Sequence, residues 1–69
     1  MSVYRVTEVI GTSSESFADA ARNAVETAAG SVRDLRIGEV VREDVTIESG
    51  KITSFRVRLA ISFKYDTGD

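Results

Sequence analysis

Carboxylates in the middle of the chain are the residues with the clearest chemical potential. Glu39, Glu43 and Asp44 lie close together in the sequence. Carboxylate oxygens are ligands that Ca²⁺ prefers, about six to eight of them at roughly 2.4 Å. The spacing does not match the calcium loop of an EF-hand, so a calcium site would have to be assembled from several copies of the chain. The alternative is that these carboxylates are solvated or form salt bridges.

Catalysis by a side-chain nucleophile or general base has little support in the composition. The chain has no histidine and no cysteine, and Thr12, Ser13 and Ser14 have no evident base beside them to activate a hydroxyl. Helix capping explains these hydroxyls better, either through Thr12 with Glu15 or through Ser13 and Ser14. The turn that begins at Gly11 has neither the length nor the lysine of a phosphate-binding P-loop. The sequence therefore predicts that the protein is not an enzyme and has no catalytic residues.

One stretch late in the chain is predicted to be the central strand of the fold. Residues 54–65 alternate strictly between apolar and other positions, the pattern of a strand with one buried face. The apolar face needs a helix to cover it, and the opposite face is where a partner or ligand is expected. The apolar face carries Phe55, Val57, Leu59, Ile61, Phe63 and Tyr65, and the opposite face carries Ser54, Arg56, Arg58, Ala60, Ser62 and Lys64.

A first strand and a helix are predicted ahead of this central strand. Residues 3–10 are rich in β-branched and aromatic side chains and favour a strand, in which Glu8 would pair with Arg58 of the central strand. A helix is predicted from about Glu15 to about Leu35, in which a glycine at position 30 marks a close contact or early fraying. The apolar stripe of this helix would consist of Phe17, Ala21, Ala24, Val25, Ala28, Val32 and Leu35.

Residues 36–48 are predicted to form the remaining strand, neither side of which is cleanly apolar. Ile37, Glu39, Val41, Glu43, Val45 and Ile47 would share one side, unless a bulge near Glu43 and Asp44 changes the alternation. A tight turn at Ser49 and Gly50 would join this strand to the central one as a hairpin. The sequence thus predicts an α+β fold of β-α-β-β order. Its three-stranded antiparallel or mixed sheet has the order first, third, second, with the third strand antiparallel to both neighbours. One helix covers one face, and the second strand lies at an open edge.

Size and charge narrow the classes of function. A single domain of 69 residues buries only ~60% of its unfolded surface, and without cysteine or histidine it has no disulfide or zinc site to stabilise it. We therefore expect self-association. A net charge of -2 and a pI near 5.0 argue against nucleic-acid binding. No apolar run is long enough to span a membrane, and the amino terminus has no secretory signal, so a cytoplasmic location is expected.

The sequence resembles the dodecin family over nearly its whole length. The matching pieces are a YRVTEVIGTS strand and turn, a GTSSES helix entry, an alanine-rich helix, a second strand containing Gly38-Glu39-Val40-Val41, and a final strand ending in Ser62-Phe63. The resemblance implies a β-α-β-β subunit that assembles into a hollow homododecamer of cubic symmetry. It also implies non-enzymatic binding and storage of a flavin, either riboflavin or FMN.

The resemblance also locates a ligand site, and this chain departs from the family pattern there. In flavin-binding dodecins a tryptophan early in the second strand stacks on the flavin, and a glutamine in the third strand hydrogen-bonds its polar edge. Ile37 stands at the tryptophan position and Arg56 at the glutamine position. Isoleucine has no π-face, and arginine offers donors only. The sequence therefore predicts an altered ligand pocket at a subunit interface, formed by Arg36, Ile37, Gly38 and Arg56.

Three other interpretations remain open at this stage. In lacking the tryptophan, this chain resembles a calcium-binding subgroup of dodecin-like proteins. That resemblance implies calcium as the ligand. Ile37 can instead be ordinary packing while the arginines form ion pairs between subunits with Glu39, Glu43 or Asp44, in a purely structural hollow assembly. A small module that adds a strand to a partner protein is the third possibility.

Overall fold

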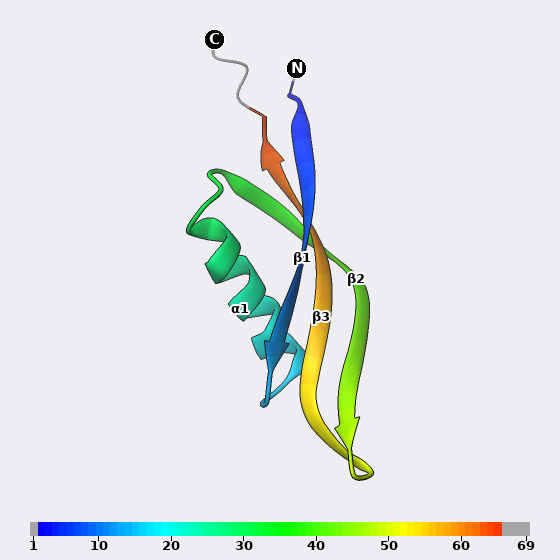
Figure 1. Ribbon diagram of the computed structural model, residues 1–69. Coiled ribbons are helices and arrows are strands. Elements are labelled where there is room, and N and C mark those ends of the chain that lie inside the picture. The colour runs from blue at the N-terminus through cyan, green and yellow to red at the C-terminus, as the bar shows by residue number, and fades with distance from the viewer. Residues whose placement is uncertain (1, 66–69) are drawn as a thin grey trace.

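Three strands and one helix follow one another in the order β-α-β-β in the computed structural model, which describes residues 2–65 (Figure 1). The elements are β1 (Tyr4–Ser13), α1 (Phe17–Ala29), β2 (Leu35–Glu48) and β3 (Lys51–Lys64). The α+β fold class and the element order predicted from the sequence are confirmed. Two strands extend beyond the predicted ranges, because β1 continues to Ser13 and β3 already begins at Lys51.

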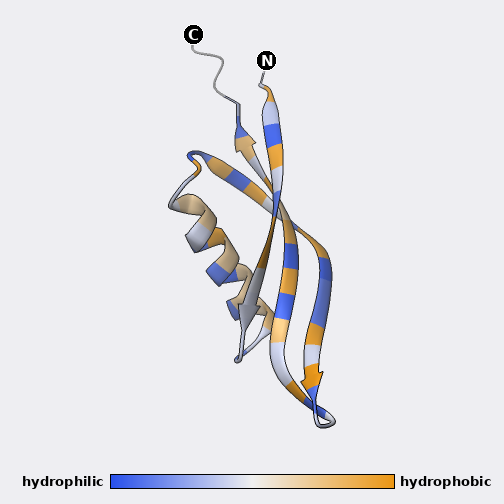
Figure 2. Cartoon of the chain, in the orientation of Figure 1, coloured by the Kyte–Doolittle hydropathy of each residue, from blue (hydrophilic) through white to orange (hydrophobic). Residues whose placement is uncertain are grey.

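The strand that the sequence predicts to be central, β3, lies between the other two. The sheet order is β1-β3-β2, and β3 pairs antiparallel with both neighbours. Figure 2 shows apolar and polar residues alternating along β3. Val57, Leu59 and Ile61 on its apolar face are at most 2% exposed, so the period-two pattern identified the buried face correctly.

Helix α1 packs on that apolar face through small side chains. Ala20, Ala24 and Ala28 form the buried side of the helix and meet the three buried residues of β3. Phe17 adds an edge-to-face contact with Phe55, with ring centroids 5.1 Å apart. The helix contacts β1 and β3 far more than β2. Consequently β2 is exposed along most of its length, and the hairpin of β2 and β3 extends past the helix (Figure 1).

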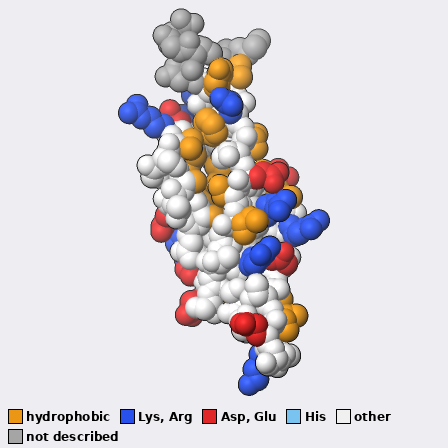
Figure 3. All heavy atoms as spheres, in the orientation of Figure 1, with side chains coloured by type: hydrophobic (Ala, Val, Ile, Leu, Met, Phe, Trp, Pro, Cys, Tyr) orange, Lys and Arg blue, Asp and Glu red, His pale blue; other side chains and the backbone are white. Residues whose placement is uncertain are grey.

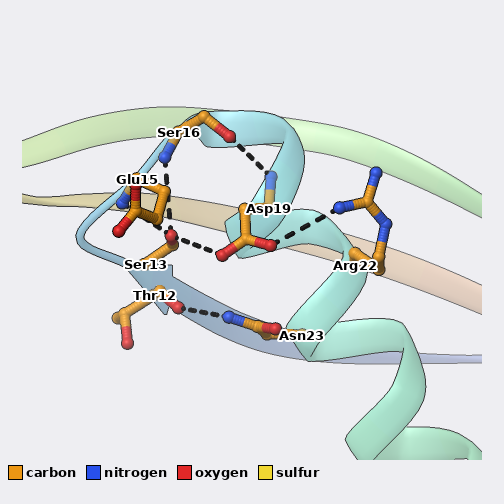
Figure 4. Close-up of polar contacts among 7 residues, drawn as sticks. All are labelled: Thr12, Ser13, Glu15, Ser16, Asp19, Arg22 and Asn23. Carbon is orange, nitrogen blue, oxygen red and sulfur yellow. Dashed lines mark hydrogen bonds and ion pairs between the residues drawn. The ribbon is translucent and has the colours of Figure 1, made fainter.

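The start of α1 uses a hydroxyl that the sequence interpretation overlooked. Ser16 is the N-cap, and its Oγ accepts a hydrogen bond from the Asp19 N–H at 2.9 Å. Ser13 Oγ accepts from the Glu15 N–H at 2.8 Å and donates to the Asp19 carboxylate at 2.7 Å (Figure 4). Thr12 contributes its backbone carbonyl, which accepts from the Asn23 side chain at 3.0 Å. Of the predicted capping residues, only Ser13 has a hydroxyl engaged in this turn.

The predicted end of the helix is wrong by about six residues, since α1 ends at Ala29 and not near Leu35. The Val32 N–H still reaches the Ala28 carbonyl at 2.9 Å, but Asp34 adopts a positive φ of 59° and turns the chain into β2. Leu35 packs against the core as part of the sheet. Gly30, placed directly after the helix, marks its end, which is the fraying alternative of the prediction. No helix among residues 2–65 is long and apolar enough to cross a bilayer.

Strand β2 contains a bulge, but not where the sequence suggested. Its register against β3 shifts between Leu35 and Ile37, between Val40 and Arg42, and between Thr46 and Ile47. The middle shift leaves Val41 unpaired and reverses the alternation ahead of the predicted position. Alternate residues from 37 to 47 therefore do not share one side. The predicted alternative, a bulge that changes the alternation, is confirmed, but at Val41 and not at Glu43 and Asp44. The hairpin turn at Ser49 and Gly50 is confirmed, with positive φ at both residues (52° and 76°), as a type I′ turn requires.

Candidate functional site

The face of the sheet opposite α1 is not covered by any element among residues 2–65, and we name it the open face. Residues paired directly across neighbouring strands point to the same side of a sheet, so the register assigns its members. They are Tyr4, Val6, Glu8, Ile10 and Thr12 on β1, Ser54, Arg56, Arg58, Ala60, Ser62 and Lys64 on β3, and Ile37, Glu39, Arg42, Asp44 and Thr46 on β2.

One end of the open face is apolar. Val6 and Ile37 flank Ser62 across the three strands. Their side chains are 64% and 67% exposed, which is unusual for aliphatic residues on a regular sheet. Tyr4 extends the apolar area along β1, and Ile10 adds a further exposed aliphatic side chain beyond Glu8. A group of exposed large apolar side chains on one face is typical of a surface that another molecule covers.

The next row along the strands is acidic. Glu8 and Glu39 flank the small side chain of Ala60. Glu8 forms an ion pair with Arg58, with Oε1 and Nη1 3.7 Å apart, as the sequence predicted. Both side chains of this pair are about half exposed, at 56% and 48%, so the pair contributes little to stability. Glu39 takes part in no ion pair among residues 2–65 and is available to a ligand or a second copy.

The following two rows contain three arginines. Arg58 lies between Ile10 and Arg42, and Arg56 lies between Thr12 and Asp44. The guanidinium of Arg56 makes two contacts with Asp44, at 2.7 Å from Nε to Oδ1 and 3.4 Å from Nη2 to Oδ2. A two-point contact of this kind fixes the orientation of the guanidinium plane. Asp44 therefore determines which nitrogens Arg56 can offer to a ligand.

The four predicted ligand residues do not meet within one chain. Ile37 pairs with Ser62, whereas Arg56 lies near the middle of β3, about 20 Å from Ser62 at ~3.3 Å per residue. Gly38 pairs with Ile61 and therefore lies on the helix side of the sheet, and Arg36 sits at a register shift. A pocket made from all four residues would need at least one more copy of the chain.

The three predicted calcium ligands are also divided. Glu39 and Asp44 lie on the open face, but Glu43 pairs with Val57 and lies on the opposite side of β2. Asp44 is already engaged by Arg56. No group of three potential metal ligands gathers anywhere in residues 2–65. Residues 2–65 of one chain therefore offer isolated carboxylates and not a formed calcium site.

Two hollows beside the helix were not predicted from the sequence. One, of about 560 Å³, lies between α1 and β1 and is lined in part by Gly11, Asn23 and Thr27. The other, of about 580 Å³, lies between α1 and β2, where Val25 and Val40 are exposed. The position of a helix across a twisted sheet depends on packing along its whole length, and no local pattern reports it.

The sequence matches a known family along almost all of its length. The sequence pattern of the Dodecin family matches residues 3–66. A calcium dodecin of Mycobacterium tuberculosis is 48% identical over 65 residues, which cover 93% of this chain and 90% of that protein.

Solved structures of dodecins have the same fold. Dodecin from Streptomyces coelicolor superposes with a TM-score of 0.91 at 37% identity, covering 97% of this chain and 96% of that one. A crystal structure of the Mycobacterium tuberculosis calcium dodecin, described as calcium-chelating with a novel calcium-binding site, superposes with a TM-score of 0.82 at 41% identity, covering 97% and 96% of the two chains. Sequence and fold agree over the same residues, and this chain belongs to the dodecin family.

Proposed function

We propose that this dodecin is a non-enzymatic binding protein whose copies assemble, as a homododecamer, through the open face and hold a small ligand between them. The observation that carries this proposal is the uncovered open face, with Val6, Ile10 and Ile37 between 48% and 67% exposed. Both outer strands, β1 and β2, also keep unpaired edges among residues 2–65. Each of these features is a liability in an isolated chain and is removed by contact with further copies.

The energies involved are large enough to matter for a domain of this size. Covering a half-exposed aliphatic side chain contributes roughly 1 kcal/mol or more. Three such residues together supply about 3 to 5 kcal/mol per copy. The whole stability of a small domain is about 0.05–0.15 kcal/mol per residue, so this burial is comparable with the stability of the folded chain itself. Assembly would therefore be part of folding.

Calcium is the ligand that we favour. The calcium dodecin of Mycobacterium tuberculosis is a relative at 48% identity. Glu39 and Glu43 are exposed and unpaired within residues 2–65. Calcium takes about six to eight oxygen ligands, more than two separated carboxylates supply, so the proposed site lies where several copies meet. Binding of this kind would store or buffer the ion.

A flavin, riboflavin or FMN, is the second candidate, and one feature of β2 favours it. Gly38 has no atom within 4 Å of the position that a Cβ would take and lines the hollow between α1 and β2, so a flat ring could approach its backbone closely on the helix side of the sheet. Two features weaken this candidate. Ile37 provides no aromatic stacking surface, and Asp44 already engages two of the three guanidinium nitrogens of Arg56, Nε and Nη2.

Three measurements on the purified protein test the proposal. Light scattering should give the mass of an assembly, and a folded monomer that is stable to dilution would refute both ligand candidates. Calorimetric titration with Ca²⁺ should show saturable heat that Glu39→Gln or Glu43→Gln reduces, while Glu26→Gln on the exposed side of α1 leaves it unchanged. If the unmodified protein shows no heat of Ca²⁺ binding, calcium is excluded as its ligand. Visible flavin absorbance in the purified particle would make flavin the ligand.

A further inference from the structure

A small cavity on the open face brings three arginines together. It has a volume of about 70 Å³ and is lined by Ile10, Arg42, Asp44, Arg56 and Arg58. These residues come from all three strands and occupy the two adjacent rows described above. Figure 3 shows basic side chains gathered on one flank of the molecule beside acidic ones. The cavity is several times larger than the ~10–15 Å³ that one water molecule needs, so it has room for a small polyatomic group.

The charges around this cavity are not balanced within the chain. Arg42 and Arg58 are direct partners across β2 and β3, and like charges directly opposite one another destabilise a sheet. Arg58 shares its charge with Glu8 at 3.7 Å, whereas no acidic side chain in residues 2–65 lies within salt-bridge distance of Arg42. Three positive charges line the cavity with one negative charge, in a protein whose net charge is -2.

The free donors of these arginines are those that an oxyanion requires. Asp44 contacts Nε and Nη2 of Arg56 and leaves Nη1 without a partner in that pair. Glu8 Oε1 approaches Nη1 of Arg58 to 3.7 Å, which is longer than a hydrogen bond, so the guanidinium of Arg58 keeps donors for a further partner. Ile10 supplies an apolar wall along which arginine stems can pack. Guanidinium groups bind phosphate through paired, charge-assisted hydrogen bonds, which recognise the arrangement of its oxygens as well as its negative charge.

We infer that the Arg42, Arg56 and Arg58 cavity is a binding site for a small oxyanion, with phosphate as its chemical class. The site goes beyond the calcium or flavin ligand proposed above. The carboxylates proposed for calcium, Glu39 and Glu43, are not among the residues that line it. Asp44 belongs to this site as the residue that orients Arg56, and not as a metal ligand. A bound phosphate would offset the repulsion between Arg42 and Arg58.

Calorimetric titration of the assembled protein with inorganic phosphate at low ionic strength tests the inference. We expect saturable binding that Arg42→Gln and Arg58→Gln each weaken at least fivefold. Arg22→Gln is the matched control, because Arg22 is an arginine on α1, away from the cavity, whose side chain is 63% exposed and pairs with Asp19. The phosphate affinity of this variant should equal that of the unmodified protein. Arg42→Lys keeps the positive charge but loses the planar guanidinium, so its phosphate affinity should fall between that of the unmodified protein and that of Arg42→Gln. Arg42→Lys also tests the contribution of Arg42 if Arg42→Gln does not fold.

The source of the phosphate group is resolved by titrating FMN and riboflavin, which differ only in their phosphate. If FMN binds tenfold more tightly than riboflavin, and both inorganic phosphate and Arg42→Gln abolish this difference, the site binds the phosphate group of a larger ligand. Equal binding or no binding of the two leaves inorganic phosphate as the ligand.

Three results would overturn the inference. The first is that phosphate titration of the unmodified protein releases no binding heat. The second is that Arg22→Gln loses as much phosphate affinity as Arg42→Gln. The third is that Arg42→Gln changes the mass of the assembly but keeps its phosphate affinity. The last result would show that these arginines pair with carboxylates of a neighbouring copy. Calcium titration of the same samples reports on the proposed function separately, so failure of one leaves the other standing.

Discussion

Helix α1 approaches the sheet closely at Gly11 of β1, and this contact makes a quantitative prediction possible. A Cβ added at this residue would overlap the backbone carbonyl oxygen of Ala20 and lie 2.8 Å from Cβ of Ala24. The obstacle is helix backbone, which cannot rotate away as a flexible side chain would. Replacing Gly11 by alanine therefore requires α1 to move off the sheet and to loosen the alanine contacts that form the core.

The expected cost of Gly11→Ala lies at or above the top of the usual range for overpacking, about 3 kcal/mol or more. At ~0.05–0.15 kcal/mol per residue the whole domain has roughly 3 to 10 kcal/mol of stability, so the variant should be close to unfolding. Gly38→Ala is the control, because nothing lies within 4 Å of its added methyl group. Alanine there should be neutral or stabilise the strand by up to ~1 kcal/mol.

Urea unfolding followed by circular dichroism measures both variants. One protein concentration must be used throughout, because assembly makes apparent stability depend on it. Gly11→Ala should shift the midpoint far below that of Gly38→Ala. If the two variants unfold at the same urea concentration, the close approach of α1 to β1 does not exist and the account of the core is wrong.

Three further predictions concern the helix start, the hairpin and the open face. Ser16→Ala removes the N-cap acceptor of the Asp19 N–H and should cost about 1 kcal/mol, which lowers the thermal midpoint by about 4–8 °C; an unchanged midpoint would contradict the cap. Gly50→Ala places a methyl group on a residue with φ of 76° and should destabilise the fold by about 1 kcal/mol, again read from the thermal midpoint. Ile37→Asp puts a charge on the apolar end of the open face and should reduce the assembled mass in light scattering, whereas Glu26→Gln on α1 should not; an undiminished mass would exclude this end of the face from the interface.

The sheet was predictable from the sequence because its signals are local. Strict alternation in β3 records which face is buried, and a Ser49-Gly50 turn between two strand patterns identifies a hairpin. The end of α1 was not predictable in the same way, since Val32 and Leu35 continue the helical period beyond Gly30. The chain turns into β2 through the positive φ of Asp34. A hydrogen bond from the Lys64 N–H to the Asp34 carbonyl, at 3.2 Å, and the packing of Leu35 on the core accompany that conformation.

The separation of Ile37 and Arg56 was within reach of sequence reasoning. In a hairpin centred on residues 49 and 50, counting outward from the turn places Ile37 opposite Ser62, as the register confirms. Arg56 then falls opposite Asp44 or its neighbour. Thus a sequence pattern that names two site residues on paired strands should always be checked against the turn before the residues are assigned to one pocket. The cavity with Arg42 was missed because Arg42 changes side at the bulge.

That bulge decides which carboxylates of β2 can act together. Glu39 and Glu43 are four residues apart and would share a side in a regular strand. The unpaired Val41 between them reverses the alternation, so Glu43 lies on the helix side and Asp44 joins Glu39 on the open face. Asp44 is occupied by Arg56, which leaves Glu39 alone. Because one carboxylate supplies at most two of the six to eight or so oxygens that calcium takes, a site built on Glu39 requires carboxylates from at least two further copies or additional oxygens from backbone and water.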